Sequence, residues 1–197
     1  GGAIVQWLRD CLGIIRRSSE VENLSSFVDS SEGVYFIPAF SGIGAPYWDQ
    51  DAKGSIFGIT RGTTDAHIAR ASLDAIAYQT MDILKAMQDD ANIDIKELRV
   101  DGGATVNDKL MQFQSDVLDT VTVRPKVIET TALGAAYLAG LAVGYWEDVD
   151  DIRSNWQEDV KFHPTEDQDT VKEGIDGWYR AINALQSWSK NSQPEKV

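Results

Sequence analysis

DGGATVN, residues 101–107, is the stretch that decides how this 197-residue chain is interpreted. It lies between a strand-like run at residues 98–100 and an amphipathic run at residues 108–118. Glycine has no Cβ, so the backbone at Gly102 and Gly103 can press close against a ligand, and the N-terminus of a following helix offers unpaired N–H groups. The stretch therefore indicates either a nucleotide-binding turn or an ordinary tight turn between a strand and a helix.

Asn107 closes this stretch and has two interpretations. Its amide oxygen can cap the helix that starts at the next residue. Equally, a side-chain amide that opens a helix beside a backbone cradle can hydrogen-bond the base or the ribose of a bound nucleotide. The residues themselves do not decide between these two roles.

Hydrophobic periodicity on both sides of the stretch predicts an α/β arrangement. Strand-like runs and runs with the helical period alternate along the chain, which is typical of one α/β domain. Asp65 is the predicted N-cap of the longest helix, and the polar residues 190–197 are predicted to form a disordered tail. Helices are expected at residues 2–12, 21–28, 65–88, 108–118, 131–143 and 168–189, and strands at residues 34–38, 55–60, 98–100 and 121–123.

The sequence also predicts how two further segments pack and which role two arginines have. Residues 131–143 are so rich in glycine and alanine that we expect this helix to lie unusually close to a sheet or to another helix. Residues 40–49 form a loop rich in glycine and aromatic residues, and we expect Trp48 to pin it to the core. Arg61 and Arg70 flank the start of the longest helix, where we expect them to be structural ion-pair partners.

The composition excludes several classes of function. A net charge of -13 argues against nucleic acid or an anionic membrane as a partner. Cys11 is the only cysteine, which leaves no intrachain disulfide and no cysteine-based metal site. No apolar run approaches the ~20 residues that span a bilayer, and the first residues lack the basic region of a signal peptide, so we expect a cytoplasmic protein.

Catalytic machinery is not visible in the sequence. The chain has neither a Walker-type phosphate loop nor a convincing pair of base and nucleophile, and His67 and His163 are its only histidines. The acidic clusters at residues 148–151 and 166–169 lack the spacing of a calcium loop and are expected to be solvated. We therefore predict no catalytic residue and no metal ligand in these residues.

Taken with its flanking blocks, the stretch at residues 101–107 resembles the corresponding motif of the glycerol kinases in the FGGY carbohydrate kinase family. The block PAFSGIGAPYW at residues 38–48 is highly characteristic of glycerol kinases. The similarity extends over essentially the whole chain, with the blocks in the family's order. The other matching blocks are GAIVQWLRD at residues 2–10, GSIFGI at residues 54–59, HIARASLD at residues 67–74 and TALGAA at residues 131–136.

This resemblance implies a fold and a ligand. The implied fold is the C-terminal domain of an α/β, ribonuclease H-like enzyme of the actin-like ATPase type, with a mixed sheet flanked by helices. Such kinases bind ATP or ADP, with Mg²⁺ in the intact enzyme, in a cleft between two domains. By position, Gly2 and Gln6 match nucleotide contacts near the phosphates and the ribose, and Gly102, Gly103 and Asn107 match the adenosine motif.

The resemblance also implies what this chain does not carry. Glycerol kinases have an N-terminal domain with the polyol-binding residues and the catalytic aspartate, and a second phosphate loop lies just before the point that matches Gly1. Residues 1–197 are thus expected to be an N-terminally truncated C-terminal domain, inactive without the N-terminal kinase domain and with one sheet edge exposed. The intact enzyme is expected to transfer the γ-phosphate of ATP to glycerol, giving glycerol 3-phosphate, and to be a homo-oligomer.

Two other functions stay open at this point. The chain is compatible with a kinase for another polyol or sugar in the same family, because the polyol-binding residues are not part of it. It is also compatible with a nucleotide-binding or interaction module that performs no chemistry. The block at residues 38–48 favours glycerol kinase over the first alternative.

Overall fold

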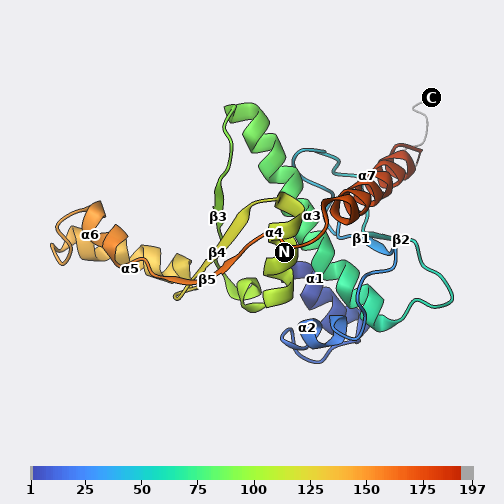
Figure 1. Ribbon diagram of the computed structural model, residues 1–197, viewed down its shortest axis with the longest axis horizontal. Helices are drawn as coiled ribbons and strands as arrows, with labels where there is room; N and C mark the ends of the chain where they lie inside the picture. The colour runs from blue at the N-terminus through green and yellow to red at the C-terminus, as the bar shows by residue number, and fades with distance from the viewer. Residues whose placement is uncertain (1, 192–197) are drawn as a thin grey trace.

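The computed structural model describes residues 2–191 of the chain (Figure 1). Its longest element is helix α3 (Asp65–Ala91), which packs against helix α2 (Glu20–Ser25), helix α4 (Asp108–Leu118) and strand β1 (Tyr35–Ile37). Small side chains on its buried side permit these contacts, because they add little bulk between the packed backbones. The buried alanines of α3 are Ala66, Ala69, Ala71, Ala75 and Ala77.

Thr64 is the N-cap of α3, and the prediction that Asp65 takes this position is wrong. The backbone of Thr64 is extended, with φ −115° and ψ 175°, and its N–H donates to Nδ1 of His67 at 3.1 Å. The side chain of Thr64 and the backbone of His67 complete a reciprocal capping box. A hydroxyl one residue earlier therefore caps the helix, and Asp65 lies in its first turn.

Strands β3 (Glu97–Arg99), β4 (Val121–Pro125) and β5 (Glu158–Phe162) form a mixed sheet. β3 runs parallel to β4, and β5 runs antiparallel to it, so β4 is the central strand. Among the described residues no strand pairs with the outer edge of β3, which agrees with the predicted exposed edge. Helix α4 packs against the sheet through contacts with β4 and β5.

Helix α7 (Gln168–Asn191) packs against a second, two-stranded sheet. That sheet pairs β1 antiparallel with β2 (Ser55–Phe57), and α7 contacts β1. The predicted tail at residues 190–197 begins too early, because Lys190 and Asn191 continue the helix, and residues 192–197 lie outside the described residues. Across residues 2–191, every helix is too short or too polar to cross a membrane. The most deeply buried side chains of α7 are Trp178, Ile182 and Leu185.

The helix predicted at residues 2–12 is divided into two pieces. An α-helical part, α1 (Gly2–Trp7), is followed by a π-helical turn, η1 (Leu8–Leu12), which ends at Gly13 with φ 71°. A left-handed glycine after a helix is a common stop, because a residue with a Cβ is strained there. The other predicted helices and strands are present, with ends shifted by three residues or fewer.

Helices α5 (Thr130–Ala142) and α6 (Val149–Ser154) form an arm, residues 130–154, that extends away from the rest of the molecule (Figure 1). The prediction that α5 packs closely against a sheet or another helix is wrong for the described residues, because no residue of α5 is buried. Tyr137 of α5 instead meets Trp146 edge-to-face, with 5.1 Å between the ring centroids. The apolar residues of α5 therefore stay partly or fully exposed in the described part of the chain, whereas α6 at the end of the arm is acidic.

Candidate nucleotide-binding site

The turn after β3 is built around Gly102. This residue has φ 86° and ψ 168°, a conformation that residues with a Cβ rarely adopt. Its N–H donates to the carbonyl of Ile128 at 2.8 Å, which ties the turn to the segment before α5. Asp101, one residue earlier, accepts a hydrogen bond from the hydroxyl of Thr130. The backbone conformation alone therefore favours glycine at position 102.

A 3-10 turn, η2 (Gly103–Val106), carries the chain from Gly102 into α4. Thr105 closes this turn, because its N–H and its hydroxyl both donate to the carbonyl of Gly102, at 3.0 and 2.8 Å. A Cβ built on Gly102 or on Gly103 would meet no heavy atom within 4 Å. The outer side of the turn is open space, and a ligand can approach its backbone without displacing protein atoms.

Asn107 caps helix α4. Its Oδ1 accepts a hydrogen bond of 2.9 Å from the N–H of Leu110, and the residue is buried. Its Nδ2 makes no hydrogen bond within residues 2–191, yet it is not one of the fully buried atoms that lack a partner. The two interpretations of Asn107 are thus compatible, because the oxygen caps the helix while the amide nitrogen keeps a free donor.

Arg124 of β4 holds the turn at residues 102–107 in place through hydrogen bonds. Its Nη1 donates to the carbonyl of Thr105 at 2.8 Å and to Oδ1 of Asp108 at 2.7 Å, and its Nε donates to Oδ2 of Asp159 at 3.1 Å. Burial disfavours the charge of this guanidinium, but the hydrogen bonds that it donates to the carboxylates of Asp108 and Asp159 outweigh this effect and raise the pKa of Arg124. Arg124 was not predicted as part of the site, since its only signal in the sequence is one basic residue within a short strand.

Gly2 and Gln6 lie one turn apart on α1, and both are exposed. A Cβ built on Gly2 would meet no heavy atom within 4 Å. The start of α4 contacts α2, the helix that follows α1 and η1 in the chain. The N–H of Lys109 on α4 donates to Oε1 of Glu22 on α2 at 3.5 Å. Figure 1 shows α1 and α2 on the side where α4 begins. That Gly2 and Gln6 contact the same nucleotide as the glycine turn stays a prediction.

This site has the chemistry of a binding surface. It offers an open glycine backbone, one amide donor and a helix start that is held rigidly by Arg124. The nearest carboxylates are already engaged, Asp101 by Thr130 and Asp108 by Arg124. Among residues 2–191 no group of three or more His, Cys, Asp or Glu side chains could hold a metal ion. The arrangement can therefore position a ligand, and it presents no acid–base pair that would act on one.

The loop at residues 40–49 is held by Tyr47, and the prediction that Trp48 pins it to the core is wrong. The hydroxyl of Tyr47 donates to Oδ2 of Asp82 on α3 at 2.8 Å. Trp48 is 76% exposed and has φ 52°, so the backbone turns its indole outward. Burial raises the pKa of Asp82, which its hydrogen bonds oppose.

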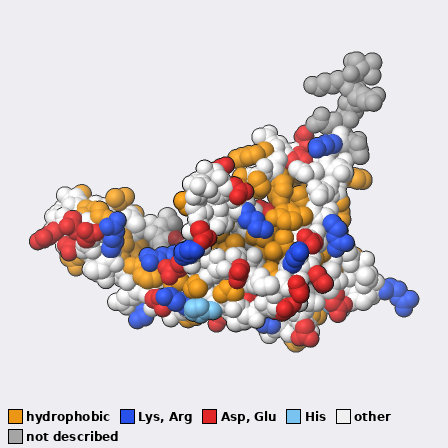
Figure 2. All heavy atoms as spheres, turned by 45° about the horizontal axis from the view of Figure 1, so that its top comes forward, with side chains coloured by type: hydrophobic (Ala, Val, Ile, Leu, Met, Phe, Trp, Pro, Cys, Tyr) orange, Lys and Arg blue, Asp and Glu red, His pale blue; other side chains and the backbone are white. Residues whose placement is uncertain are grey.

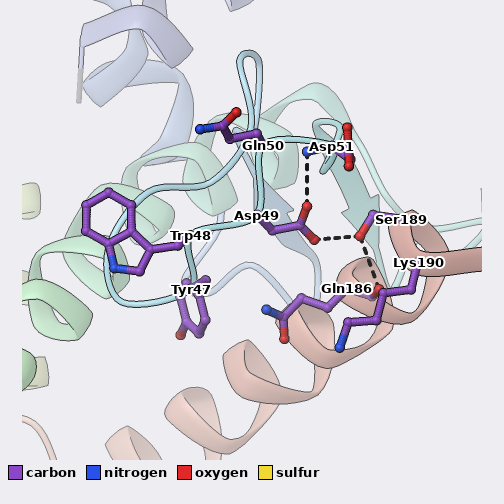
Figure 3. Close-up of a pocket in the computed structure, with 8 residues that line it drawn as sticks. All are labelled: Tyr47, Trp48, Asp49, Gln50, Asp51, Gln186, Ser189 and Lys190. Atoms are coloured by element: carbon purple, nitrogen blue, oxygen red, sulfur yellow. Dashed lines mark hydrogen bonds between the residues drawn. The ribbon is translucent and has the colours of Figure 1, made fainter. Parts of the chain in front are cut away.

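A hollow of about 450 Å³ lies between this loop and the end of α7 (Figure 3). Both oxygens of Asp49 are occupied there, one by the N–H groups of Asp51 and Ala52 and the other by the hydroxyl of Ser189 at 2.5 Å. Figure 3 shows the indole of Trp48 pointing away from Asp49 and Ser189. The lining side chains do not converge on one point, so this hollow lacks the geometry of a catalytic centre.

The ion pair predicted for Arg70 is present. Its Nε donates to Oδ1 of Asp74 at 2.8 Å, and its Nη1 donates to the carbonyl of Asp29 at 3.0 Å. Burial raises the pKa of Asp74 to about 6, although Arg70 opposes this shift. Arg61 is exposed and forms no ion pair within the described residues. Arg70 therefore has a structural role, as expected, and the prediction for Arg61 is not supported.

Known proteins share this sequence and geometry. The family model described as "FGGY family of carbohydrate kinases, C-terminal domain" matches residues 1–143. The chain belongs to the FGGY family of carbohydrate kinases. It is 60% identical over 189 residues to a glycerol kinase from Paraburkholderia phytofirmans, and 61% identical over 189 residues to one from Chromobacterium violaceum. Each match covers 96% of this chain and 38% of the relative.

Solved structures confirm the fold expected of this FGGY family member. A crystal structure of Plasmodium falciparum glycerol kinase with ADP superposes with a TM-score of 0.82 at 38% identity, over 93% of this chain and 37% of that one. Ligand-bound xylulose kinase from Lactobacillus acidophilus has the same TM-score at 23% identity, over 98% of this chain and 40% of that one, which shows the fold alone. The mixed sheet and its helices are thus those of the actin-like ATPase fold, and the chain spans 38% of the length of the glycerol kinases that it matches.

Proposed function

We propose that this chain is the nucleotide-binding C-terminal domain of a glycerol kinase. The intact enzyme transfers the γ-phosphate of ATP to a hydroxyl of glycerol, giving glycerol 3-phosphate and ADP. The observation that carries the proposal is the 60% identity to a glycerol kinase across 96% of the chain. The 38% identity to a glycerol kinase that was crystallised with ADP supports the nucleotide as ligand.

In this proposal the adenosine moiety lies against the turn at Gly102 and Gly103, where no protein atom would meet an added Cβ. The free Nδ2 of Asn107 donates to the nucleotide, while its Oδ1 keeps the helix start in place. Gly2 and Gln6 contact the ribose and phosphate side from α1. Orientation of the nucleotide is the contribution of this chain to catalysis, because phosphoryl transfer depends on holding donor and acceptor in line.

The exposed surface of α5 supports a missing N-terminal kinase domain as the partner. No residue of α5 is buried in the described part of the chain. Figure 2 shows apolar side chains over the centre of the molecule and along the arm. Leu138, Val143 and Tyr145 of the arm are more than two-thirds exposed. Exposed apolar area of this kind is normally covered by another part of the protein.

Mg²⁺ would accompany ATP in the intact enzyme, held there by phosphate oxygens, water and one or two carboxylates. Among residues 2–191 no group of three or more His, Cys, Asp or Glu side chains could hold a metal ion, and no residue of this chain is assigned as a ligand. No step is assigned to the ion on this chain. We further propose that the intact enzyme is a cytoplasmic homo-oligomer and that residues 1–197 alone have no kinase turnover.

The experiment is steady-state kinetics of the intact enzyme with Gly103→Val. A branched side chain in the open space at Gly103 should raise the KM for ATP at least about ten-fold, since it removes close backbone contact, and leave the KM for glycerol nearly unchanged. Gly62→Val is the matched control, because Gly62 is exposed and a Cβ there meets only Thr60 Oγ1 at 3.8 Å. Equal changes in both KM values, or a preference for another polyol or sugar over glycerol, would contradict the proposal.

A further inference from the structure

A hollow of about 780 Å³ lies where the arm joins the sheet. Its walls come from the ends of β3 and β4, the segment after β4, the first turns of α5, the end of α6 and the segment between α6 and β5. In open α/β folds, ligands bind beyond the carboxyl ends of the parallel strands, and β3 and β4 are the parallel pair here. None of the residues proposed to contact the nucleotide lines this hollow.

The hollow is basic, although the whole chain has a net charge of -13. Arg99, Lys126 and Arg153 line it, and no aspartate or glutamate of the described part does. Figure 2 shows Lys and Arg side chains along the junction between the arm and the body, with acidic groups among them. A local excess of cations in an acidic protein attracts anions and raises their concentration at that point.

Two of these three cations form ion pairs with carboxylates that do not line the hollow, Arg99 with Glu97 and Arg153 with Asp150, and Lys126 forms none among the described residues. Nζ of Lys126 donates to the uncharged Oε1 of Gln157 at 3.3 Å, so no ion pair of the described residues balances its charge. Nη1 of Arg153 donates to Oδ1 of Asp150 at 2.5 Å, on the exposed surface of α6. Lys126 is therefore the cation of the hollow that most lacks a counter-ion.

Two contacts orient Arg99, whose side chain is 62% exposed. Its Nε donates to Oε1 of Glu97 at 3.0 Å, and its guanidinium carbon lies 4.2 Å from the ring centroid of Trp156. Its two terminal nitrogens make no hydrogen bond within residues 2–191. A planar guanidinium that is already oriented by an aromatic ring loses little freedom when it binds two oxygens of one anion.

We propose that this hollow binds a small phosphate ester, with the phosphate group held by Arg99 and Lys126. The free terminal nitrogens of Arg99 bind two phosphate oxygens, and Nζ of Lys126 supplies a second positive charge. A dianionic phosphate matches two cations better than a single carboxylate does. The rings of Tyr137 and Trp156 line the same hollow and contact the carbon part of the ester.

Calorimetric titration of the full 197-residue chain at constant ionic strength tests this site, with inorganic phosphate and glycerol 3-phosphate as the probes. The ester should bind more tightly than inorganic phosphate, because only the ester reaches the aromatic walls. The indole N–H resonance of Trp156, assigned with Trp156→Phe, should shift during the titration. Arg99→Gln and Lys126→Gln should each weaken binding about ten-fold, since each removes one charge-assisted contact.

Arg61→Gln is the matched control, because Arg61 is an exposed arginine outside the hollow. It should leave the affinity unchanged, which separates a local site from general attraction of anions. Arg99→Gln removes the contact of Arg99 with the ring of Trp156, so it can weaken binding by moving that ring. Lys126→Gln tests the phosphate contact separately, since Lys126 makes no ring contact among the described residues. Equal weakening by Arg61→Gln, binding of inorganic phosphate as tight as that of the ester, or an unmoved Trp156 resonance would overturn the proposal.

Discussion

The hydroxyl of Tyr47 and the indole Nε1 of Trp178 donate to the same oxygen, Oδ2 of Asp82, at 2.8 and 2.9 Å. One buried carboxylate of α3 therefore joins the loop at residues 40–49 to helix α7. The other oxygen of Asp82 is buried without a partner within the described residues, so the two hydrogen bonds are the main compensation for its burial.

Tyr47→Phe should lower the free energy of unfolding by about 1–3 kcal/mol, because it removes one of these two donors and leaves a buried carboxylate less satisfied. Denaturation in urea measures the change. Trp48→Phe is the matched control one residue away, and it should change stability by less than about 0.5 kcal/mol, since Trp48 is exposed. A larger loss from Trp48→Phe than from Tyr47→Phe would contradict the assignment of Tyr47 as the anchor.

Because the pKa of Asp74 is raised, its contribution to the free energy of unfolding should fall as the pH rises. A carboxylate in an exposed ion pair contributes in the opposite direction, since its stabilisation is lost as the pH falls. Burial raises the pKa of Asp74 from 3.8 to about 6 in the folded state. Its contribution to the free energy of unfolding is therefore fully present below pH 4 and is lost as the pH rises through about 6. The loss expected from a shift of roughly two pKa units is about 3 kcal/mol.

Urea denaturation of the wild type and of Asp74→Asn between pH 4 and pH 7 tests this pKa. The difference in unfolding free energy, wild type minus variant, should fall as the pH rises. Asp89→Asn, an exposed position on the same helix, should give a nearly constant difference. A difference that grows with pH for Asp74→Asn would mean that Arg70 dominates and that the pKa is lowered.

Gly177→Ala should destabilise the protein by about 1–3 kcal/mol, because overpacking forces neighbouring groups to move. A Cβ on Gly177 would overlap the phenol ring of Tyr35, which belongs to β1. Gly134→Ala is the control on another helix, where an added Cβ meets nothing within 4 Å. That change should be neutral or stabilise the chain by up to about 1 kcal/mol, since alanine favours a helix over glycine. Thermal unfolding of both variants distinguishes the two outcomes.

Elements with a regular apolar period were predictable from the sequence, and acidic ones were not. Helix α7 shows its stripe in the sequence, and its buried residues Trp178 and Ile182 follow that stripe. Neither strand β5 nor helix α6 was predicted, and α6 overlaps the acidic cluster at residues 148–151 that was expected to be solvated. In β5 only Phe162 is buried, because the strand pairs with β4 on one side only and exposes most of its side chains.

Close packing was predictable only where its partner is part of the described chain. The alanines of α3 are buried against α2, α4 and β1, whereas α5 has no buried residue and its Gly140 meets the ring of Trp146 in the same arm. At the site, the glycines and Asn107 could be predicted because a turn and a helix cap need those residue types. Arg124 could not, since its hydrogen bonds to Thr105 and Asp108 depend on how β4 lies beside η2.

Arg124→Met should loosen the turn at residues 102–107 while leaving the sheet folded. The substitution keeps an unbranched apolar side chain, but it removes the hydrogen bonds to Thr105, Asp108 and Asp159 that hold the turn on β4. Amide hydrogen exchange in residues 103–107 should become at least about ten-fold faster, since a hydrogen bond to a charged group contributes roughly 1.5–3 kcal/mol. Arg16→Met, at an exposed arginine far along the chain, should leave this exchange unchanged. If both variants exchanged at the wild-type rate, the turn would be held by Gly102 and Thr105 alone.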